Sequence, residues 1–161
     1  MAFDAFLKLD GVPGESADAK HKGEIEVLSF SFGVSQAGGA PTGGGGGAGK
    51  ASFTDFHFTA RTQKSSPRLF VACAAGEHFK KAVLALRKAG GKQQDYITIT
   101  FSDVRITSYQ AAGAAEADDG PLDQVSLGYG RIAIEYREQD PKGALAPPVK
   151  GGWDLKANKK V

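Results

Sequence analysis

The chain has 161 residues, enough for one domain with its own hydrophobic core. Its 20 basic and 18 acidic side chains give a formal charge of +2, with both signs spread along the sequence, which argues against a nucleic-acid or anionic-membrane surface. The only cysteine, Cys73, excludes an intramolecular disulfide. Neither a leader of the Sec type nor a run of about 18 apolar residues is recognisable, so we expect no membrane insertion.

Two alternating patterns in the first third of the chain flank a glycine-rich block. Apolar side chains recur at every second position from Ile25 to Val34, with one change of phase, and again from Phe56 to Ala60, which predicts strands. The block between them, rich in glycine, predicts a long extended loop over 36–52.

One short helix follows. Ser66 is expected as its N-cap, Pro67 as its first helical residue and Gly76 as its end. The next segment, 79–88, fits a helical face and a strand face equally well. The glycines that follow it, before a clear strand, favour a hairpin, so we interpret 79–88 as a strand.

The second half of the chain predicts two long strands, over 97–109 and 125–136, because apolar and polar side chains alternate there. The alternation changes phase at three places, and a β-bulge at each would restore the inward direction. The changes lie between Val27 and Phe30, Phe101 and Val104, and Tyr129 and Ile132. A mobile loop is expected over 111–121, a further loop over 141–152, and a short strand at 153–155.

These elements predict a mainly β fold in a single domain spanning 1–161. We expect a two-sheet antiparallel β-barrel or sandwich, one short flanking α-helix and the long glycine-rich loop. Bulged, bent strands suit a sheet that curls or folds over itself.

The segment from Gly44 to Lys50 has the G-x-x-x-x-G-K spacing of a phosphate-binding loop. A working loop of this kind leads into a helix and carries Ser or Thr after the lysine, to hold magnesium. Here Ala51 occupies that place and a strand pattern follows. A flexible loop is the better interpretation.

Other candidate sites are equally weak. Cys73 could pair with His57 or His78 as nucleophile and base, but it falls on the apolar face of the helix, where a thiol is usually buried. The histidines lack zinc-ligand spacing, and the acidic pair at 118–119 does not fit a calcium loop. We therefore expect no catalytic residue, no cofactor, no metal site and no enzyme activity.

Seven segments, in this order, resemble the haemolysin-coregulated protein family, the tube subunit of bacterial type VI secretion systems. They are His21–Ser35, Phe53–Thr59, Ser65–Phe70, Ala72–Ala74, Tyr96–Tyr109, Val125–Tyr136 and Gly152–Lys156. The resemblance covers about the whole chain, which is more specific than any one motif. It also implies that 79–88 is a strand.

The resemblance implies a structural tube subunit. Six copies would close head to tail into a ring, and rings would stack into a tube that a contractile sheath propels behind a spike protein. Small effector proteins would travel in the lumen. The chain would assemble in the cytoplasm and leave through the apparatus, with no nucleic-acid partner.

The resemblance also implies two interface regions. The ring-stacking loop would comprise Gly38, Gly39, Pro41, Thr42, Gly43, Gly44, Gly45, Gly46, Gly47 and Lys50. A second contact between subunits is expected at Trp153, Asp154 and Leu155.

The alternative is a carbohydrate- or ligand-binding β-sandwich. Trp153, Tyr109 and Tyr136 would then be exposed together on one concave face. Aromatic rings more often fill cores or interfaces, so this alternative ranks second.

Overall fold

The computed structural model describes residues 2–36, 50–88 and 93–161. Within them, helix α1 (Ser65–Ala75) is the single helix, and all strand pairings are antiparallel. The strands are β1 (Phe3–Leu9), β2 (Ile25–Val27), β3 (Ser29–Ser31), β4 (Val34–Gln36), β5 (Ala51–Phe53), β6 (Phe56–Arg61), β7 (His78–Lys88), β8 (Asp95–Ala112), β9 (Leu122–Tyr136), β10 (Val149–Asp154) and β11 (Lys159–Lys160). The expected mainly β fold with one short helix is confirmed, as is the strand at 79–88.

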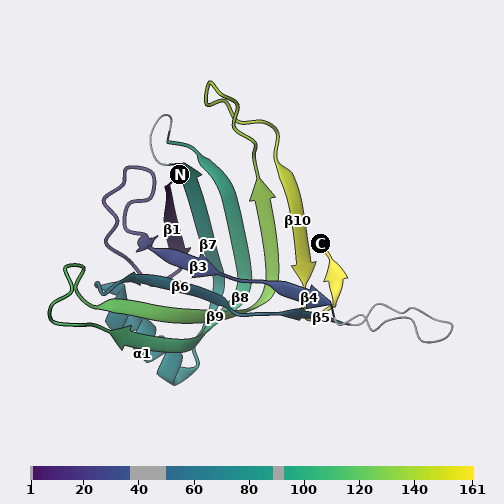
Figure 1. Ribbon diagram of the computed structural model, residues 1–161. Coiled ribbons are helices and arrows are strands. Elements are labelled where there is room, and N and C mark those ends of the chain that lie inside the picture. The colour runs from purple at the N-terminus through teal and green to yellow at the C-terminus, as the bar shows by residue number, and fades with distance from the viewer. Residues whose placement is uncertain (1, 37–49, 89–92) are drawn as a thin grey trace.

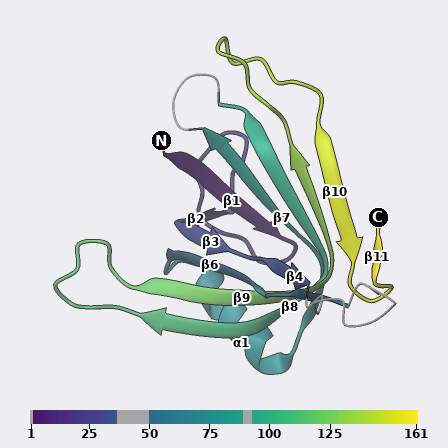
Figure 2. The same ribbon diagram turned by 45° about the vertical axis from the view of Figure 1, so that its right-hand side comes forward.

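Nine strands form one sheet that folds over itself into two layers (Figure 1). The upper layer has the order β11-β10-β9-β8-β7-β1-β2. In the lower layer, β6 pairs with the first half of β9, and β3 pairs with β6. Strands β4 and β5 form a separate hairpin. The sandwich is confirmed, whereas the described strands do not close into a barrel (Figure 2).

Strands β8 and β9 pass through both layers and bend at the fold between them. At the bend Asp103 has a positive φ of 55°, and a Cβ on Gly130 of β9 would lie 3.0 Å from an Asp103 carboxylate oxygen. Pairing continues in register across this point, from Ser102 with Arg131 to Val104 with Tyr129. Both strands therefore change phase together.

Two expected bulges are thus wrong, because no extra residue enters either strand at Phe101–Val104 or Tyr129–Ile132. The register shift of this pair lies farther along, between Ile106 and Ser108. The third change of phase, between Val27 and Phe30, marks a crossing between layers. There Val27 pairs with β1, whereas Ser29 pairs with β6.

The hydrophobic core lies between the two layers. Phe56 of the lower layer and Phe101 of β8 are completely buried, with ring centroids 4.7 Å apart. Leu7, Ile25 and Leu127 are also fully buried around them. Burial of each such side chain stabilises the fold by about 1.5–3 kcal/mol.

The alternation of apolar and polar residues did not predict strand β1. Ala5, Phe6 and Leu7 are all buried in succession, because β1 is covered on both faces and lies between β2 and β7. A strand buried on both faces loses its period of two. Strand β10 likewise begins at Val149, inside the loop expected over 141–152.

Helix α1 begins two residues earlier than expected. Lys64, not Ser66, is its N-cap, and no side chain caps it. Ser66 is buried; its hydroxyl accepts a bond from the Gln63 N–H at 2.9 Å and donates to the carboxylate of Asp123 on β9. The predicted end is confirmed, since Gly76 has a φ of 65° and its N–H bonds the last turn.

Candidate functional site

The loop expected over 36–52 lies between β4 and β5, and these two strands pair as a hairpin. Its glycines and the Pro41–Thr42 pair lie outside the described residues, and Lys50 is exposed just before β5. At the base of the hairpin the Thr54 N–H donates to the Gly33 carbonyl at 2.9 Å, and the Tyr129 hydroxyl donates to the Thr54 carbonyl at 2.9 Å. The hairpin is thereby fixed to β9.

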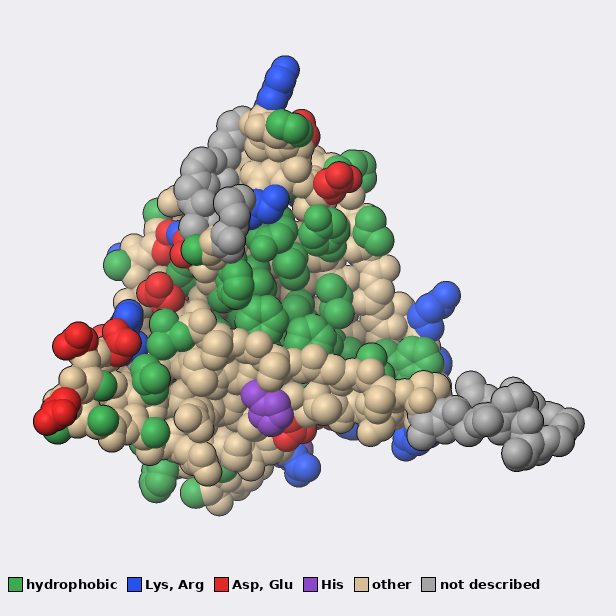
Figure 3. Space-filling view, viewed as in Figure 1, with side chains coloured by type: hydrophobic (Ala, Val, Ile, Leu, Met, Phe, Trp, Pro, Cys, Tyr) green, Lys and Arg blue, Asp and Glu red, His purple; other side chains and the backbone are tan. Residues whose placement is uncertain are grey.

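An apolar groove of about 430 Å³ separates this hairpin from strands β9 and β10. Its lining residues are Phe32, Gly33, Val34, Ser35, Gln36, Ala51, Phe53, Ile132, Ile134, Gly151, Gly152 and Trp153. None of them is charged. Figure 3 shows hydrophobic side chains gathered in this hollow between the two layers.

The floor of the groove is open because a glycine lies where a side chain would fill it. Gly151 of β10 pairs with Ile134 of β9, and side chains of a cross-strand pair share a face. A Cβ on Gly151 would meet nothing within 4 Å. Ile134 and Val34 remain 38% and 61% exposed, so both walls present apolar surface to solvent.

The three expected interface residues lie at the end of this groove but differ in their surroundings. Trp153 lines the groove and packs against the core. The Asp154 carboxylate accepts the Ala157 N–H at 2.9 Å and an Arg131 N–H at 3.2 Å, and these two bonds lower the pKa of Asp154. The Leu155 N–H bonds the Gly130 carbonyl, and its side chain also packs on the core.

Helix α1 carries a second exposed apolar surface. Pro67, Phe70, Val71 and Ala74 recur at helical spacing and all are exposed, with Phe70 and Val71 each more than half exposed. Leu69 and Ala72 occupy the opposite, buried face. We call the exposed set the α1 ridge.

The outer face of the lower layer is largely polar, with the charged side chain of Arg61 at the end of β6. A shallow hollow there is lined by Ser29, Phe30, Ser31, His57, Phe58, Thr59, Ser108, Gln110, Gln124, Val125 and Ser126. The hydroxyls of Ser29 and Thr59 lie 2.5 Å apart, and the His57 Nδ1 lies 2.6 Å from the Ser126 hydroxyl. Some polar side chains of this face therefore hydrogen-bond one another.

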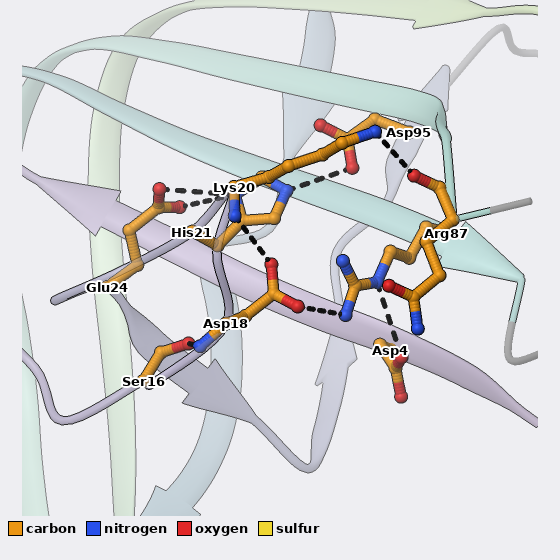
Figure 4. A network of polar contacts seen from close by, with 9 residues as sticks. Asp4, Ser16, Asp18, Lys20, His21, Glu24, Arg87 and Asp95 are labelled. Carbon is orange, nitrogen blue, oxygen red and sulfur yellow. Dashed lines mark hydrogen bonds and ion pairs between the residues drawn. The ribbon is translucent and has the colours of Figure 1, made fainter.

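Charged side chains gather instead beside β1 and β7, where the segment between β1 and β2 crosses the sheet (Figure 4). The Arg87 guanidinium is 4% exposed and contacts Asp18 at 2.5 Å and Asp4 at 3.3 Å. The hydrogen bond from Arg87 lowers the pKa of Asp18. The ion pair between Asp18 and Arg87 thus holds the segment between β1 and β2 against the sheet.

His21 of the same segment makes a second set of contacts with the sheet. Its ring stacks on Phe6 with centroids 4.5 Å apart, while Nδ1 lies 3.0 Å from Glu24 and Nε2 lies 2.9 Å from Asp95. Burial alone would lower the pKa of His21, but the two carboxylates outweigh it and raise the pKa. Both ring nitrogens face acceptors, which favours the imidazolium.

The weaker candidate sites do not come together. No group of three or more His, Cys, Asp or Glu that could hold a metal occurs among the described residues. Lys50 leads directly into strand β5 and not into a helix, so the context of a phosphate loop is missing. Helical structure in the described chain is nowhere long and apolar enough to cross a membrane.

Comparison with known proteins agrees with this architecture. A family model described as "Type VI secretion system effector, Hcp" matches residues 6–136. Protein Hcp1 of Pseudomonas aeruginosa is 41% identical over 160 residues, which are 98% of each chain. The chain belongs to the Hcp family.

Solved structures extend the match. A crystal structure of Hcp1 from Salmonella typhimurium is 35% identical, covers 100% of both chains and has a TM-score of 0.82. A structure described as a type six secretion system protein is 33% identical, covers 99% of this chain and 100% of its own, and has a TM-score of 0.94. This Hcp-family chain is a type VI secretion tube subunit.

The ligand-binding alternative is not favoured. Tyr109 pairs across from Val125 in the lower layer, whereas Trp153 pairs with Ile132 in the upper layer. The Tyr109 hydroxyl also donates to buried Asp123 at 2.8 Å. The aromatic residues thus belong to different parts of the molecule and do not form one concave binding face.

Sequence reasoning missed the groove itself. The alternation predicted for the strand over 125–136 places Ile132 and Ile134 on one face, yet Ile132 is buried and Ile134 is 38% exposed. The available signal was the glycine pair at 151–152 next to Trp153, since glycine beside an apolar strand leaves space for another molecule to approach.

Proposed function

We propose that six copies of this chain close head to tail into a ring, and that the rings stack into a tube. A contractile sheath would drive the tube, with a spike protein at its tip, out of the cell that assembles it. The uncharged groove between the β4–β5 hairpin and β10 carries the proposal, together with family membership. A monomer gains nothing from exposed apolar walls, whereas an assembly buries them.

Ring closure is proposed to cover this groove. Trp153 has the best-placed side chain of the three expected interface residues, because it alone lines the groove. Asp154 and Leu155 support the strand that presents it. A head-to-tail contact joins two different surfaces of one chain and closes into a ring when its rotation allows.

Ring stacking is proposed to use the glycine-rich loop from Gly38 to Lys50. The β4–β5 hairpin supports its two ends and is fixed to β9 through Thr54 and Tyr129. Ordering glycine costs more conformational entropy than ordering other residues. Stacking should therefore be weaker than ring closure.

The lumen is proposed to be lined by the outer face of the lower layer, which includes the uncharged hollow. Hydroxyl and amide side chains of β3, β6, β8 and β9 compose it, and the chain's formal charge is only +2. A surface of this kind neither attracts nor repels cargo strongly by charge. It suits small effector proteins of varied composition that must later be released.

Work of this kind needs no catalysis. We propose that the chain is not an enzyme, binds no nucleic acid and is not inserted in a membrane, and that it assembles in the cytoplasm before secretion through the type VI apparatus. Shape and copy number, and not reactive groups, would perform the function.

Light scattering coupled to negative-stain microscopy tests the ring directly. The expected mass is six times 16.8 kDa, about 101 kDa, with annular particles. A chain that remains monomeric at high concentration and binds sugars would contradict the proposal and favour the β-sandwich alternative.

Deletion of Gly43 to Gly47 separates the two kinds of contact. We expect rings of unchanged mass and fewer stacked particles, because the deletion shortens only the proposed stacking loop. The matched control replaces the same five residues by a Gly-Ser sequence of equal length. Loss of the ring itself in the deletion variant would show that the loop serves ring closure.

A further inference from the structure

The segment between β1 and β2 contains a loop that is closed at its base. The Gly14 N–H donates to the Gly23 carbonyl at 2.8 Å, and the Gly23 N–H donates to the Ser16 carbonyl at 2.8 Å. A Cβ on Gly14 would lie 2.4 Å from the Glu24 carbonyl oxygen, so glycine is needed for this close approach. Residues 15–22 form the excursion, which we call the 15–22 loop. Because its ends meet, the loop can leave the sheet while β1 and β2 stay in place.

The 15–22 loop is held to the sheet by polar contacts. Its apolar side chains, Ala17 and Ala19, are exposed, and its two buried residues are Ser16 and His21. The loop, all of which the structure describes, thus buries no large apolar side chain. Segments with few buried apolar contacts open at a lower free energy than the whole fold does. Polar and charged groups therefore decide whether the loop stays closed.

Two neighbouring strands present charges of opposite sign to the loop. Arg87 of β7 and Asp95 of β8 are cross-strand partners, because the register of this strand pair shifts just after Leu86 and brings them opposite each other. Arg87 contacts Asp18 of the loop at 2.5 Å, and Asp95 lies 2.9 Å from the His21 Nε2. The loop thus presents one negative and one positive partner in return (Figure 4). Of these four side-chain types, histidine is the one that ordinarily loses its charge near neutral pH.

We propose that the 15–22 loop is a pH-dependent strap, closed while His21 carries a proton on both ring nitrogens and open once one of them is lost. A neutral imidazole donates from one ring nitrogen only, so it cannot donate to both Glu24 and Asp95. The lone pair of the other nitrogen then faces a carboxylate in a buried place, which is unfavourable. Opening of the loop moves that nitrogen into water and uncovers Phe6, on which the ring stacks. This switch does not depend on the proposed ring or tube.

The direction of the switch follows from the balance between burial and charge at His21. Burial lowers the pKa of His21, but the bonds to Asp95 and Glu24 outweigh burial and raise the pKa. A raised pKa means that the closed loop binds the proton more tightly than the open loop does. The closed form is therefore favoured at low pH and weakens as the pH rises through the pKa of the closed form. The loop should be closed at pH 6 and open more often at pH 9.

The other charged groups around His21 belong to residue types that titrate outside this range. They are Asp18, Lys20 and Lys22 of the loop, Glu24 before β2, Glu26 of β2, Asp4 and Lys8 of β1, Arg87 of β7 and Asp95 of β8. Carboxyl groups ordinarily titrate below pH 6, and lysine and arginine above pH 9. A change in the loop between pH 6 and pH 9 would therefore belong to the imidazole.

Hydrogen exchange followed by mass spectrometry tests the loop directly. Exchange is measured at pH 6 and pH 9 and corrected for the pH dependence of exchange in an unfolded peptide, with a peptide from β8 as the internal reference. In the natural chain, residues 15–24 should lose protection at pH 9 while β8 keeps its own. His21→Gln should show the lower protection at both pH values. His21→Arg, which keeps its charge and can stack on Phe6, should keep the higher protection at both.

His78→Gln is the matched control. His78 also lies beside an aspartate, Asp103 at 3.8 Å, but its side chain is 67% exposed. This variant should leave the pH dependence of residues 15–24 unchanged. Equal protection of 15–24 at pH 6 and pH 9 in the natural chain would overturn the inference, and so would a loss shared by β8, which would mean global unfolding. If circular dichroism shows that His21→Arg does not fold, the natural chain and His21→Gln decide the question.

Discussion

The two edges of the upper layer satisfy their side chains in opposite ways. Beside β1 and β7, charged groups such as Arg87 and His21 are buried and paired within the chain. Beside β9 and β10, apolar groups such as Ile134 and Trp153 line a groove that no other part of the described chain fills. The charged groups named at the first edge have partners within the monomer, and the apolar walls named at the second are left uncovered by the described chain.

This difference separates stability from assembly. A buried charge without a partner costs several kcal/mol of stability, so the ion pairs at the first edge must form during folding. Exposure of apolar surface to water has only a modest free-energy cost. The second edge can therefore stay exposed until another molecule covers it. Substitutions at the first edge should therefore change unfolding, and substitutions at the second should change association.

The largest expected effect is at Arg87. Arg87→Met keeps the length of the side chain but leaves Asp18 and Asp4 without their partner. A fully buried pair broken in this way costs about 3–5 kcal/mol. Because both carboxylates retain some solvent contact, we expect a loss of about 2 kcal/mol in the free energy of unfolding. Urea denaturation measures it.

Arg131→Met is the matched control for this prediction. Arg131 pairs with Asp154 at 3.2 Å, but its side chain is half exposed. Exposed pairs contribute about 0–1 kcal/mol, so its effect should be the smaller. Equal losses for the two arginine variants would show that the first edge owes no special stability to its buried charge.

The next effect depends on pH. The pKa of His21 is raised above its ordinary value of 6.5, so its contribution to stability is complete below that value and is lost as pH rises through the folded-state pKa. Gln has no charge to lose. The stability difference between the natural chain and His21→Gln should be largest at pH 6 and decline towards pH 9.

Urea titrations of both chains at several pH values measure this difference. Glu24 and Asp95 face the two ring nitrogens, and Lys20, Asp18 and Arg87 lie in the same cluster. Carboxyl groups ordinarily titrate below pH 6, and lysine and arginine above pH 9, so the change belongs to the imidazole. A difference that grows with pH would mean that His21 is neutral in the folded chain.

The contrast between the edges also explains what the sequence revealed. Strands β6, β8 and β9 were predicted because each has one face towards the core, which produces alternation. Strand β1 was missed because both of its faces are covered. The phase change at Phe101–Val104 was seen but its cause was not, since a bend shared by two strands and a bulge in one produce the same pattern.

The candidate site was harder to predict for a related reason. Trp153 was assigned to an interface through the family resemblance, but the groove depends on the distance between β4 and β10, which are more than 100 residues apart in sequence. Nor could spacing show that Ser66 bonds Asp123 instead of capping the helix. Such contacts exist only once the layers have packed.

A smaller effect on stability is expected at the second edge. Val34→Ser removes an apolar side chain from the groove wall that is 61% exposed. The free energy of unfolding should change by no more than about 0.5 kcal/mol. Ring formation, measured by light scattering over a dilution series, should weaken. A stability loss as large as that of Arg87→Met would remove the distinction between the two edges.

The smallest effect is expected at Lys50, which belongs to neither edge. Its side chain is exposed, and strand β5 follows it at once. Lys50→Ala should leave the unfolding free energy within about 0.5 kcal/mol and ring mass unchanged. Calorimetry should detect no ATP binding by either chain. ATP binding that disappears in the variant would mean that the G-x-x-x-x-G-K spacing holds phosphate without a helix behind it, contrary to the way such loops neutralise charge.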